Sequence, residues 1–359
     1  MAHRSAADEP PSTSATKTSM SPDSPRLAAL RHFAAHALDD PSLTLAPASV
    51  DASFRSYWRS TGKFGNHIVM DAPPEHEDIV PFLDVAARLE RAGVHVPQIV
   101  ASDVKQGFIL MEDLGNRTYL PELKADSVDA LHGAALDALL AMQTSADATG
   151  LPRYDRERLM TEMGLLPTWF LEKHLGHAAT DEQHAIIRRA FGWLANVAAE
   201  QPAVFVHRDY HSRNLLVCEP RSPGVIDFQD AVLGPLTYDL ASLLRDCYIE
   251  WDDARVSPWV ETYRLRALDA GLIDASVDTE TFLRWFDLIG VQRHIKVLGI
   301  FCRLWYRDGK AQYLGDLPLV WRYTTRIARR YPELAELLAI LENAVGDRDL
   351  THAVSATLA

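Results

Sequence analysis

The segment VFVHRDYHSRNLLV, residues 204–217, places eight polar side chains between two short apolar runs. The β-branched and apolar residues on either side predict strands, so the polar residues form a loop at a strand edge. Within it, His207, Asp209 and Asn214 give the pattern H-x-D-x-x-x-x-N. A loop that only reversed the chain would more readily use Gly, Pro or Asn-Gly. The composition therefore indicates a loop that holds charged groups.

A second carboxylate, Asp227, lies thirteen residues beyond Asn214 in the segment GVIDFQDA. The run LLVCEPRSPGVID predicts a hairpin, which would return Asp227 to the loop that carries Asp209 and Asn214. Two carboxylates and an amide oxygen would then face one cavity. Mg²⁺ prefers such hard oxygen ligands, usually one or two carboxylates together with phosphate oxygens of the substrate. The pattern therefore predicts a magnesium site.

The order and spacing of these residues resemble the catalytic loop and metal-binding Asp of protein-kinase-like phosphotransferases. The resemblance implies that Asp209 accepts the proton of the attacking hydroxyl. It also implies that Asn214 and Asp227 hold the metal, with ATP and Mg²⁺ as cofactors. His207 is expected to support the loop by hydrogen bonds, and Asp239, in the first turn of a predicted helix, to do the same.

Two arginines of the loop raise separate questions. Arg213 either points at the γ-phosphate, where a cation stabilises the transition state, or forms a surface ion pair. Only eleven residues separate Asp227 from Asp239, and no APE motif follows them, so the regulatory segment of protein kinases is missing. Arg208 therefore has no evident phosphorylated residue to bind, and the acceptor is expected to be a small molecule.

Three segments, HRDYHSRN, GVIDFQDA and GPLTYDLASLL, together resemble the aminoglycoside/choline phosphotransferase family. Others, including DASFRSYWR, FILMEDLG and QRHIKVLGIFCRLWYRDGK, resemble bacterial anomeric amino-sugar kinases of cell-wall recycling, over about residues 26–345. This similarity implies ATP-dependent transfer to the C1 hydroxyl of N-acetylmuramate or N-acetylglucosamine, giving the sugar 1-phosphate. Two other interpretations stay open: an aminoglycoside or other small-alcohol phosphotransferase of the same fold, and a nucleotide-binding pseudokinase.

The elements that position these residues predict an α+β, protein-kinase-like fold with two lobes. Residues 25–115 read mainly as strands and are expected to form a small β-rich, nucleotide-binding N-terminal lobe. Residues 116–350 are mainly helical and are expected to form the larger catalytic and acceptor-binding lobe. Residues 1–24, rich in Ser, Thr, Pro and Ala, are expected to be a disordered tail.

The predicted nucleotide contacts depart from the protein-kinase pattern. The third strand reads IVMD without a lysine, and the Gly-rich loop is replaced by DASFRSY. Phosphates are therefore expected to bind backbone amides around Ser53 and the side chains of Arg55 and Arg59. Main-chain groups of Glu112 and Leu114, in FILMEDLG, are expected to pair with the nucleobase edge.

A helix predicted over residues 291–309 interrupts an apolar pattern with five basic side chains: Arg293, His294, Lys296, Arg303 and Arg307. Residues three or four apart share a helix face. In one interpretation Arg293 and His294 belong to a basic wall that binds the lactyl carboxylate of N-acetylmuramate. In the other, each cation pairs with a neighbouring Asp or Glu. Polycationic aminoglycosides would need an acidic pocket, so these cations favour the amino sugar.

Composition limits the partners. A net charge of −13 over 359 residues argues against nonspecific nucleic-acid binding. No apolar run approaches the ~18–20 residues that span a membrane, and the N-terminus lacks the apolar segment of a signal peptide. The three cysteines show no metal-binding spacing and are expected to be free thiols in a reducing cytosol. The sequence therefore predicts a cytoplasmic enzyme whose partner is a small amino sugar.

Overall fold

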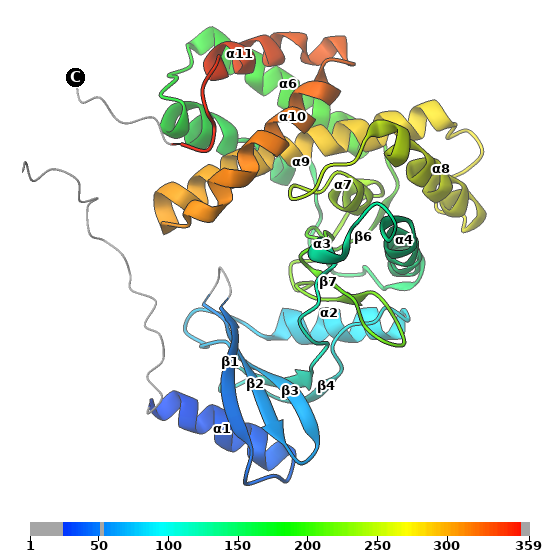
Figure 1. Cartoon of the computed structure of the whole chain (residues 1–359). Coiled ribbons are helices and arrows are strands. Elements are labelled where there is room, and N and C mark those ends of the chain that lie inside the picture. The colour runs from blue at the N-terminus through cyan, green and yellow to red at the C-terminus, as the bar shows by residue number, and fades with distance from the viewer. Residues whose placement is uncertain (1–23, 51–53, 353–359) are drawn as a thin grey trace, which may run out of the picture. The chain divides into compact units, whose positions relative to one another are not determined.

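The computed structural model describes residues 24–50 and 54–352 (Figure 1). Contacts between Cα atoms divide the chain into two compact units. Unit 1 comprises the chain up to Glu77 together with Ala101–Leu110, and unit 2 comprises Asp78–Val100 with Met111–Ala359. Each unit has its own buried apolar residues. The helix at residues 80–91, which follows the first three strands, therefore belongs to unit 2.

A five-stranded sheet with the order β1-β2-β3-β5-β4 dominates the N-terminal part of the chain. One helix and five strands build this region: α1 Pro25–Ala37, β1 Thr44–Val50, β2 Ser56–Gly62, β3 Gly65–Asp71, β4 Ile99–Asp103 and β5 Phe108–Glu112. Leu30 and Ala34 of α1 join the same apolar cluster as Trp58 and Val69 of the sheet. Burial of this helix face against strand side chains stabilises unit 1.

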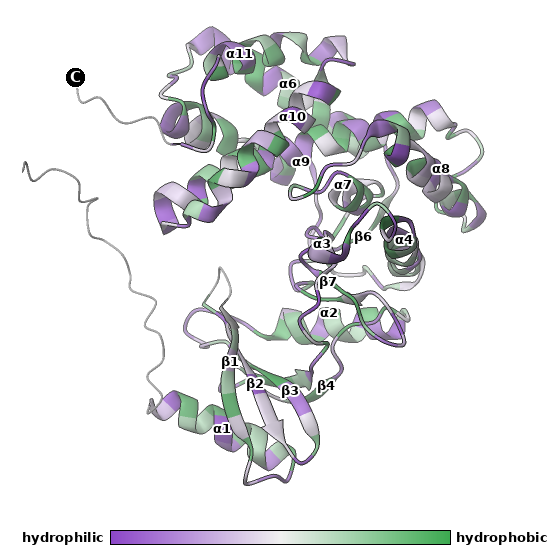
Figure 2. Ribbon diagram, in the orientation of Figure 1, coloured by the Kyte–Doolittle hydropathy of each residue, from purple (hydrophilic) through white to green (hydrophobic). Residues whose placement is uncertain are grey.

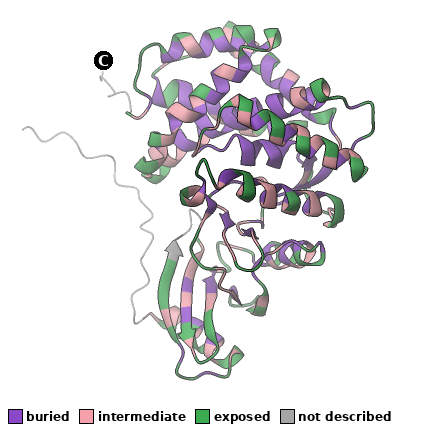
Figure 3. Ribbon diagram, turned by 45° about the vertical axis from the view of Figure 1, so that its right-hand side comes forward, coloured by how far each residue is buried: buried purple, intermediate pink, exposed green. Residues whose placement is uncertain are grey.

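Unit 2 is mainly helical. Its longer helices are α2 Val80–Arg91, α4 Val128–Ser145, α5 Arg156–Met163, α6 Asp181–Ala199, α7 Tyr238–Leu244, α8 Asp253–Asp269, α9 Thr279–Asp308, α10 Leu317–Ala328 and α11 Ala335–Val345. Hydrophobic and hydrophilic residues alternate along several of them, and α2 and α10 are strongly amphipathic (Figure 2). Buried ribbon faces the interior of the bundle and exposed ribbon the outside (Figure 3). This alternation is what an amphipathic helix packed on a core requires.

Two short antiparallel pairs interrupt the helices of unit 2. Strand β6, Ala203–Val206, pairs with β9, Val232–Pro235, and β7, Leu215–Leu216, pairs with β8, Gly224–Val225. The two strands that flank the polar loop therefore do not pair with each other. Each is bound by a strand that comes later in the chain, so the loop is fixed at both ends.

Helix α9 is the longest element of unit 2, and most of its residues from Phe282 to Cys302 are buried. The side chain of Asp278 caps its first turn, and Gly309, with φ +68°, ends it. Gly299 lies against Leu165, where an added Cβ would be 2.6 Å from the Leu165 carbonyl carbon. Only glycine allows an approach this close, so α9 packs tightly on the segment after α5.

The predicted fold class is confirmed, and residues 116–350 are mainly helical as expected. Within this part of the chain, residues 156–174 divide into α5 and a π-helix, Leu166–His174. Pro167 lies at its start and has no N–H to donate to the preceding turn, so the α-helical bonding is interrupted there. Among residues 24–50 and 54–352, no helix combines the length and the apolarity needed to cross a membrane.

Candidate active site

The hairpin predicted after Asn214 is present. Leu215 pairs with Val225, and the Ile226 N–H donates to the Asn214 carbonyl at 3.1 Å. Asn214 Nδ2 consequently lies 3.3 Å from Asp227 Oδ2 and 3.0 Å from the main-chain oxygen of Asp209. The structure therefore brings together the three residues on which the predicted chemistry depends.

The side chain of Asp239 holds the catalytic loop through two backbone amides of the loop. Its Oδ2 accepts from the His207 N–H at 2.6 Å, and its Oδ1 accepts from the Arg208 N–H at 3.0 Å. Arg208 has a φ of +79°, in the left-handed region, which costs about 1–3 kcal/mol for such a residue. Burial raises the pKa of Asp239 to about 7, although the two amide hydrogen bonds oppose the increase. One carboxylate thus fixes a strained backbone next to Asp209.

His207 supports the loop from the other side. Its Nε2 donates to the Ile226 carbonyl at 3.1 Å, and its Nδ1 accepts from the Asp209 N–H at 3.3 Å. These two bonds require the neutral ring with the proton on Nε2. Burial lowers the pKa of His207 to about 4, which agrees with a neutral ring. The histidine therefore joins the chain before Asp209 to the chain before Asp227.

Asp209 lies in a cationic environment. Burial opposes its ionisation, but the charges of Lys296, His211, Arg208 and Arg293 outweigh burial and lower the pKa of Asp209. Asp209 itself remains partly exposed to solvent. At neutral pH the side chain is therefore a carboxylate, which can accept a hydrogen bond from a hydroxyl group.

The donor set around Asp227 fits a divalent cation. Asp227 has a φ of +64°, and its Oδ1 accepts from Gln229 Nε2 at 2.8 Å. Gln229 Oε1 is buried and has no hydrogen-bond partner. Carboxylate and amide oxygens are hard ligands of the kind that Mg²⁺ binds. The described residues contain no cluster of three or more His, Cys, Asp or Glu for a metal, so water and phosphate would complete the coordination.

Arg213 lies at the exposed side of the loop. Its Nη2 is 3.7 Å from Asp316 Oδ2, and its guanidinium carbon lies 3.5 Å from the centre of the Tyr248 ring. Its side chain is 41% exposed, so the ion pair is weak and solvated. The geometry is that of the surface ion pair, and contact with a phosphate stays a prediction.

The first three cations of α9 lie inside unit 2. Arg293 Nη1 is 3.0 Å from Cys247 Sγ. His294 Nε2 donates to the Arg245 carbonyl at 2.9 Å, and its ring stacks on Tyr323. All three basic residues, Lys296 included, are at least nine-tenths buried. Sugar contacts by Arg293 and His294 stay predictions.

Lys296, Arg303 and Arg307 of α9 have different surroundings. Lys296 Nζ lies 3.0 Å from Glu162 Oε2 of α5, while Arg307 pairs with the adjacent Asp308. Arg303 Nε is buried and has no hydrogen-bond partner. These side chains therefore do not form one basic wall, because Lys296 is buried and paired while Arg307 faces solvent.

Of the residues predicted to contact the nucleotide, Arg55 and Arg59 belong to unit 1, and Glu112 and Leu114 belong to unit 2. Ser53 lies outside the described residues. Arg55 Nε is 3.4 Å from Glu77 Oε2, and Arg59 lies on the less buried face of β2, opposite Trp58. In unit 2 the Glu112 N–H donates to the Gln98 carbonyl at 2.9 Å, and the Leu114 carbonyl accepts from Cys218 Sγ at 3.6 Å.

Sequence reasoning missed Glu162 and Gln229. Glu162 lies on α5 and contacts Arg208 and Lys296, and Gln229 contacts Asp227. No local pattern separates Glu162 from Glu157, an exposed acid on the same helix. The signal available in the sequence was indirect. The regulatory segment is missing, so the arginine before Asp209 has no phosphorylated partner and needs another counter-ion.

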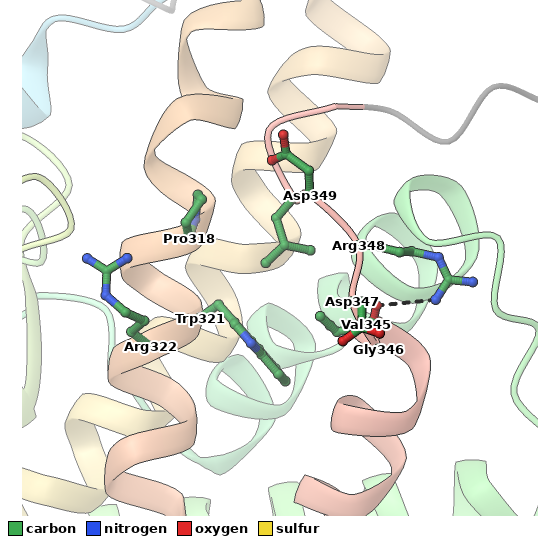
Figure 4. A pocket seen from close by; sticks show the side chains of 9 residues that line it. Pro318, Trp321, Arg322, Val345, Gly346, Asp347, Arg348 and Asp349 are labelled. Atoms are coloured by element: carbon green, nitrogen blue, oxygen red, sulfur yellow. Dashed lines mark hydrogen bonds between the residues drawn. The ribbon is translucent and has the colours of Figure 1, made fainter.

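A hollow of about 360 Å³ lies elsewhere in unit 2, between α10 and the segment after α11. Trp321 and Arg322 line one side, and residues 345–350 line the other (Figure 4). Arg322 donates to Glu250, and Arg348 to the carbonyl groups of Ala344 and Val345. Its arginines are satisfied within the chain, so we assign it no ligand.

Comparison with known proteins agrees with this geometry. Residues 44–274 match the phosphotransferase enzyme family, which is more than half of the chain. The chain belongs to this family. The N-acetylmuramate/N-acetylglucosamine kinase of Pseudomonas aeruginosa is 49% identical over 301 residues, which cover 84% of this chain and 88% of that kinase.

Solved structures of other kinases and phosphotransferases share the fold. An ADP-bound aminoglycoside phosphotransferase matches with a TM-score of 0.55 at 14% identity, over 84% of this chain and 98% of that one. An ethanolamine kinase of Plasmodium vivax matches with a TM-score of 0.60 at 10% identity, over 89% of this chain and 90% of that one. The fold is therefore protein-kinase-like, and the chain is a small-molecule kinase rather than a pseudokinase.

Proposed function

We propose that this kinase transfers the γ-phosphoryl group of ATP to the C1 hydroxyl of N-acetylmuramate or N-acetylglucosamine. The product is the sugar 1-phosphate, and the role is peptidoglycan recycling in the cytoplasm, where ATP is available. The adjacency of Asp209, Asn214 and Asp227 carries the proposal. The identity of 49% with an N-acetylmuramate/N-acetylglucosamine kinase supports the choice of acceptor.

Asp209 is the group that accepts the proton of the sugar hydroxyl. The cations around it keep it ionised, and His207 and Asn214 fix its backbone. Asn214 and Asp227 would hold Mg²⁺, which neutralises charge on the phosphates when it is bound. Most of the rate enhancement in such a transfer comes from positioning and charge stabilisation, because the protein contributes little covalent chemistry.

Main-chain groups of Glu112 and Leu114 are proposed to pair with the nucleobase edge. The Glu112 N–H and the Leu114 carbonyl already have partners within unit 2. The nucleobase edge would therefore use the Glu112 carbonyl and the Leu114 N–H. Phosphates would contact amides around Ser53 and the guanidinium groups of Arg55 and Arg59.

Arg213 is proposed to reach the γ-phosphate. Its bond with Asp316 is long and its side chain is 41% exposed, so exchange of partners costs little. A phosphate binds a guanidinium more strongly than a distant carboxylate does, because two parallel hydrogen bonds form. Its replacement by Lys would keep the charge and lose that geometry.

The lactyl carboxylate of N-acetylmuramate is proposed to draw on Arg293 and His294. Arg293 donates a hydrogen bond to the Cys247 thiol, which is a weak acceptor, and a carboxylate would be a stronger one. Burial lowers the pKa of His294 to about 3, so the neutral ring would have to redirect its single N–H from the Arg245 carbonyl to the carboxylate. Arg293→Lys should then raise KM for N-acetylmuramate more than for N-acetylglucosamine.

A screen of acceptors tests the proposal. The purified chain is incubated with MgATP and, separately, with N-acetylmuramate, N-acetylglucosamine, glucose and kanamycin, and ADP release is measured. We expect turnover with the two amino sugars, and ³¹P and ¹H NMR should place the phosphate on C1. Turnover with kanamycin alone would instead support an aminoglycoside phosphotransferase, and phosphate on another hydroxyl would contradict the anomeric assignment.

A further inference from the structure

A buried ionic cluster contacts the catalytic loop within unit 2. Glu162, on α5, accepts from Arg208 Nη2 through Oε1 at 2.5 Å and lies 3.0 Å from Lys296 Nζ through Oε2. The side chains of Glu162 and Arg208 are each 14% exposed, and that of Lys296 is 8% exposed. One carboxylate therefore serves two largely buried cations.

Two tyrosines complete this cluster. The Tyr154 hydroxyl donates to Glu162 Oε2, and it lies 3.2 Å from the Tyr238 hydroxyl. Lys296 Nζ also donates to the Tyr238 hydroxyl at 3.2 Å. Tyr238 is the first residue of α7 and precedes Asp239, which accepts from the loop amides. The cluster thus joins α5, the catalytic loop, α7 and α9.

Arg208 is held at two points in this arrangement. Its amide donates to Asp239 and its guanidinium to Glu162, while the ring of Tyr154 lies 5.5 Å from the guanidinium carbon. Its φ of +79° is a conformation that such a residue keeps only when its surroundings enforce it. The next residue in the chain is Asp209. The orientation of Asp209 therefore depends on how firmly Arg208 is fixed.

We infer that Glu162 is a positioning residue for phosphoryl transfer: it holds Arg208, and through Arg208 the conformation of the loop that carries Asp209. Protein kinases order their activation segments by pairing arginine with a phosphorylated residue. Here the anion is a carboxylate built into α5, so the loop needs no modification to be fixed. The inference rests on the proposed role of Asp209 as the base.

The first test replaces Glu162 with an uncharged side chain of the same size. Glu162→Gln should lower kcat at least tenfold while KM for ATP and for the amino sugar stays within threefold, because no residue of the cluster is among the proposed ATP or sugar contacts. Glu162→Asp keeps the charge and should recover part of the loss. The matched control is Glu157→Gln, an exposed acid of the same helix, which should keep the wild-type kcat.

A double-mutant cycle separates positioning through Arg208 from a general structural effect. Both Glu162→Gln and Arg208→Met break one link, so the double variant should lose no more kcat than the worse single variant. It also removes one of the two cations that Glu162→Gln leaves without a counter-ion, Lys296 remaining, so it should be less destabilised than Glu162→Gln alone. Losses that multiply would overturn the inference, as would a wild-type kcat in Glu162→Gln or a change confined to KM.

A measurement without substrate keeps this inference separate from the proposed function. Hydrogen exchange of the peptide that covers residues 204–217 reports on the loop directly. Glu162→Gln should speed exchange in this peptide at least tenfold, and Glu157→Gln should leave it unchanged. Unchanged exchange in both variants overturns the inference. A wild-type chain that phosphorylates neither sugar contradicts the proposed function and leaves this readout intact.

Discussion

The catalytic loop and helix α9 both place basic and acidic side chains in an apolar part of the chain, but their partners lie at different distances along the sequence. In the loop, Asn214 contacts Asp209 and Asp227, five and thirteen residues away. In α9, Lys296 pairs with Glu162, which lies in α5. The predicted catalytic and metal-binding roles in the loop follow from local spacing, whereas the partner of Lys296 is set by tertiary packing.

The largest effect is expected from the carboxylate of the loop. Asp209→Asn removes the proton acceptor and keeps the shape, so turnover should fall by roughly 10²–10⁴-fold, the usual contribution of a general base. ATP should still bind. Coupled assay of ADP release and calorimetry of nucleotide binding measure the two properties, and a wild-type rate would remove Asp209 from the mechanism.

The second effect tests the metal ligand. Asp227→Ala should lower turnover by roughly 10²-fold or more, as loss of a charge-stabilising contact does, and should weaken the response to Mg²⁺ concentration. Asp230→Ala, which changes an exposed acid three residues later, is the control and should titrate with Mg²⁺ as the wild type does. Identical Mg²⁺ curves for both variants would contradict the ligand role.

The comparison predicts a difference within α9. Lys296→Met removes a buried cation and leaves Glu162 with one partner fewer, so the free energy of unfolding should fall by about 2 kcal/mol. Arg307→Met removes an exposed cation paired with Asp308 and should change it by less than about 0.5 kcal/mol. Urea unfolding measures both, and equal losses would show that burial does not distinguish the two cations.

Acid should destabilise the folded chain through His294, the buried histidine of α9. Burial, together with the charges of Arg293, Arg245 and Arg326, lowers the pKa of His294 to about 3, against the Arg245 carbonyl bond. Since the folded pKa lies below the unfolded value of about 6.5, stability from this group is present above pH 6.5 and is lost as pH falls toward 3. At pH 5 the loss is of the order of 2 kcal/mol.

His294→Gln removes this titration. The free energies of unfolding of the wild type and the variant should therefore approach each other between pH 7 and pH 5. Urea unfolding at pH 7, 6 and 5 measures the difference. Burial lowers the pKa of His207 in the loop to about 4. The free energies of unfolding of the wild type and of a His207 variant should therefore also approach each other as the pH falls from 7 to 5. A difference that stays constant with pH would contradict both assignments.

The sequence predicted the loop and its hairpin because both depend on neighbours in the chain. Asn214 and Asp227 are separated by a run whose apolar residues and turn residues mark a hairpin, and the structure contains it. The helices followed from apolar periodicity in the same way. The π-helix that begins at Leu166 was not predicted; Pro167 lacks an N–H there, and the α-helical bonding is interrupted.

The counter-ions could not be predicted from the sequence. Glu162 pairs with Arg208 and Lys296 across 46 residues or more, and nothing in the pattern RERLMTEM marks it as buried. Arg293 likewise finds a thiol, Cys247, that has no motif around it. Charges on a helix are assigned by whichever element packs there, and single-sequence periodicity does not specify that element.

The short connection between Asp227 and Asp239 has a consequence for how this enzyme can diverge. It contains β9, which pairs with β6, and it ends at the carboxylate that accepts from the His207 and Arg208 amides. An inserted residue here would shift one of these partners and release the loop. The exposed turn at residues 219–221, between β7 and β8, does not bind the His207 and Arg208 amides. Insertions that create new acceptor preferences should therefore accumulate outside this connection. The catalytic loop and the connection that holds it should keep a constant length together.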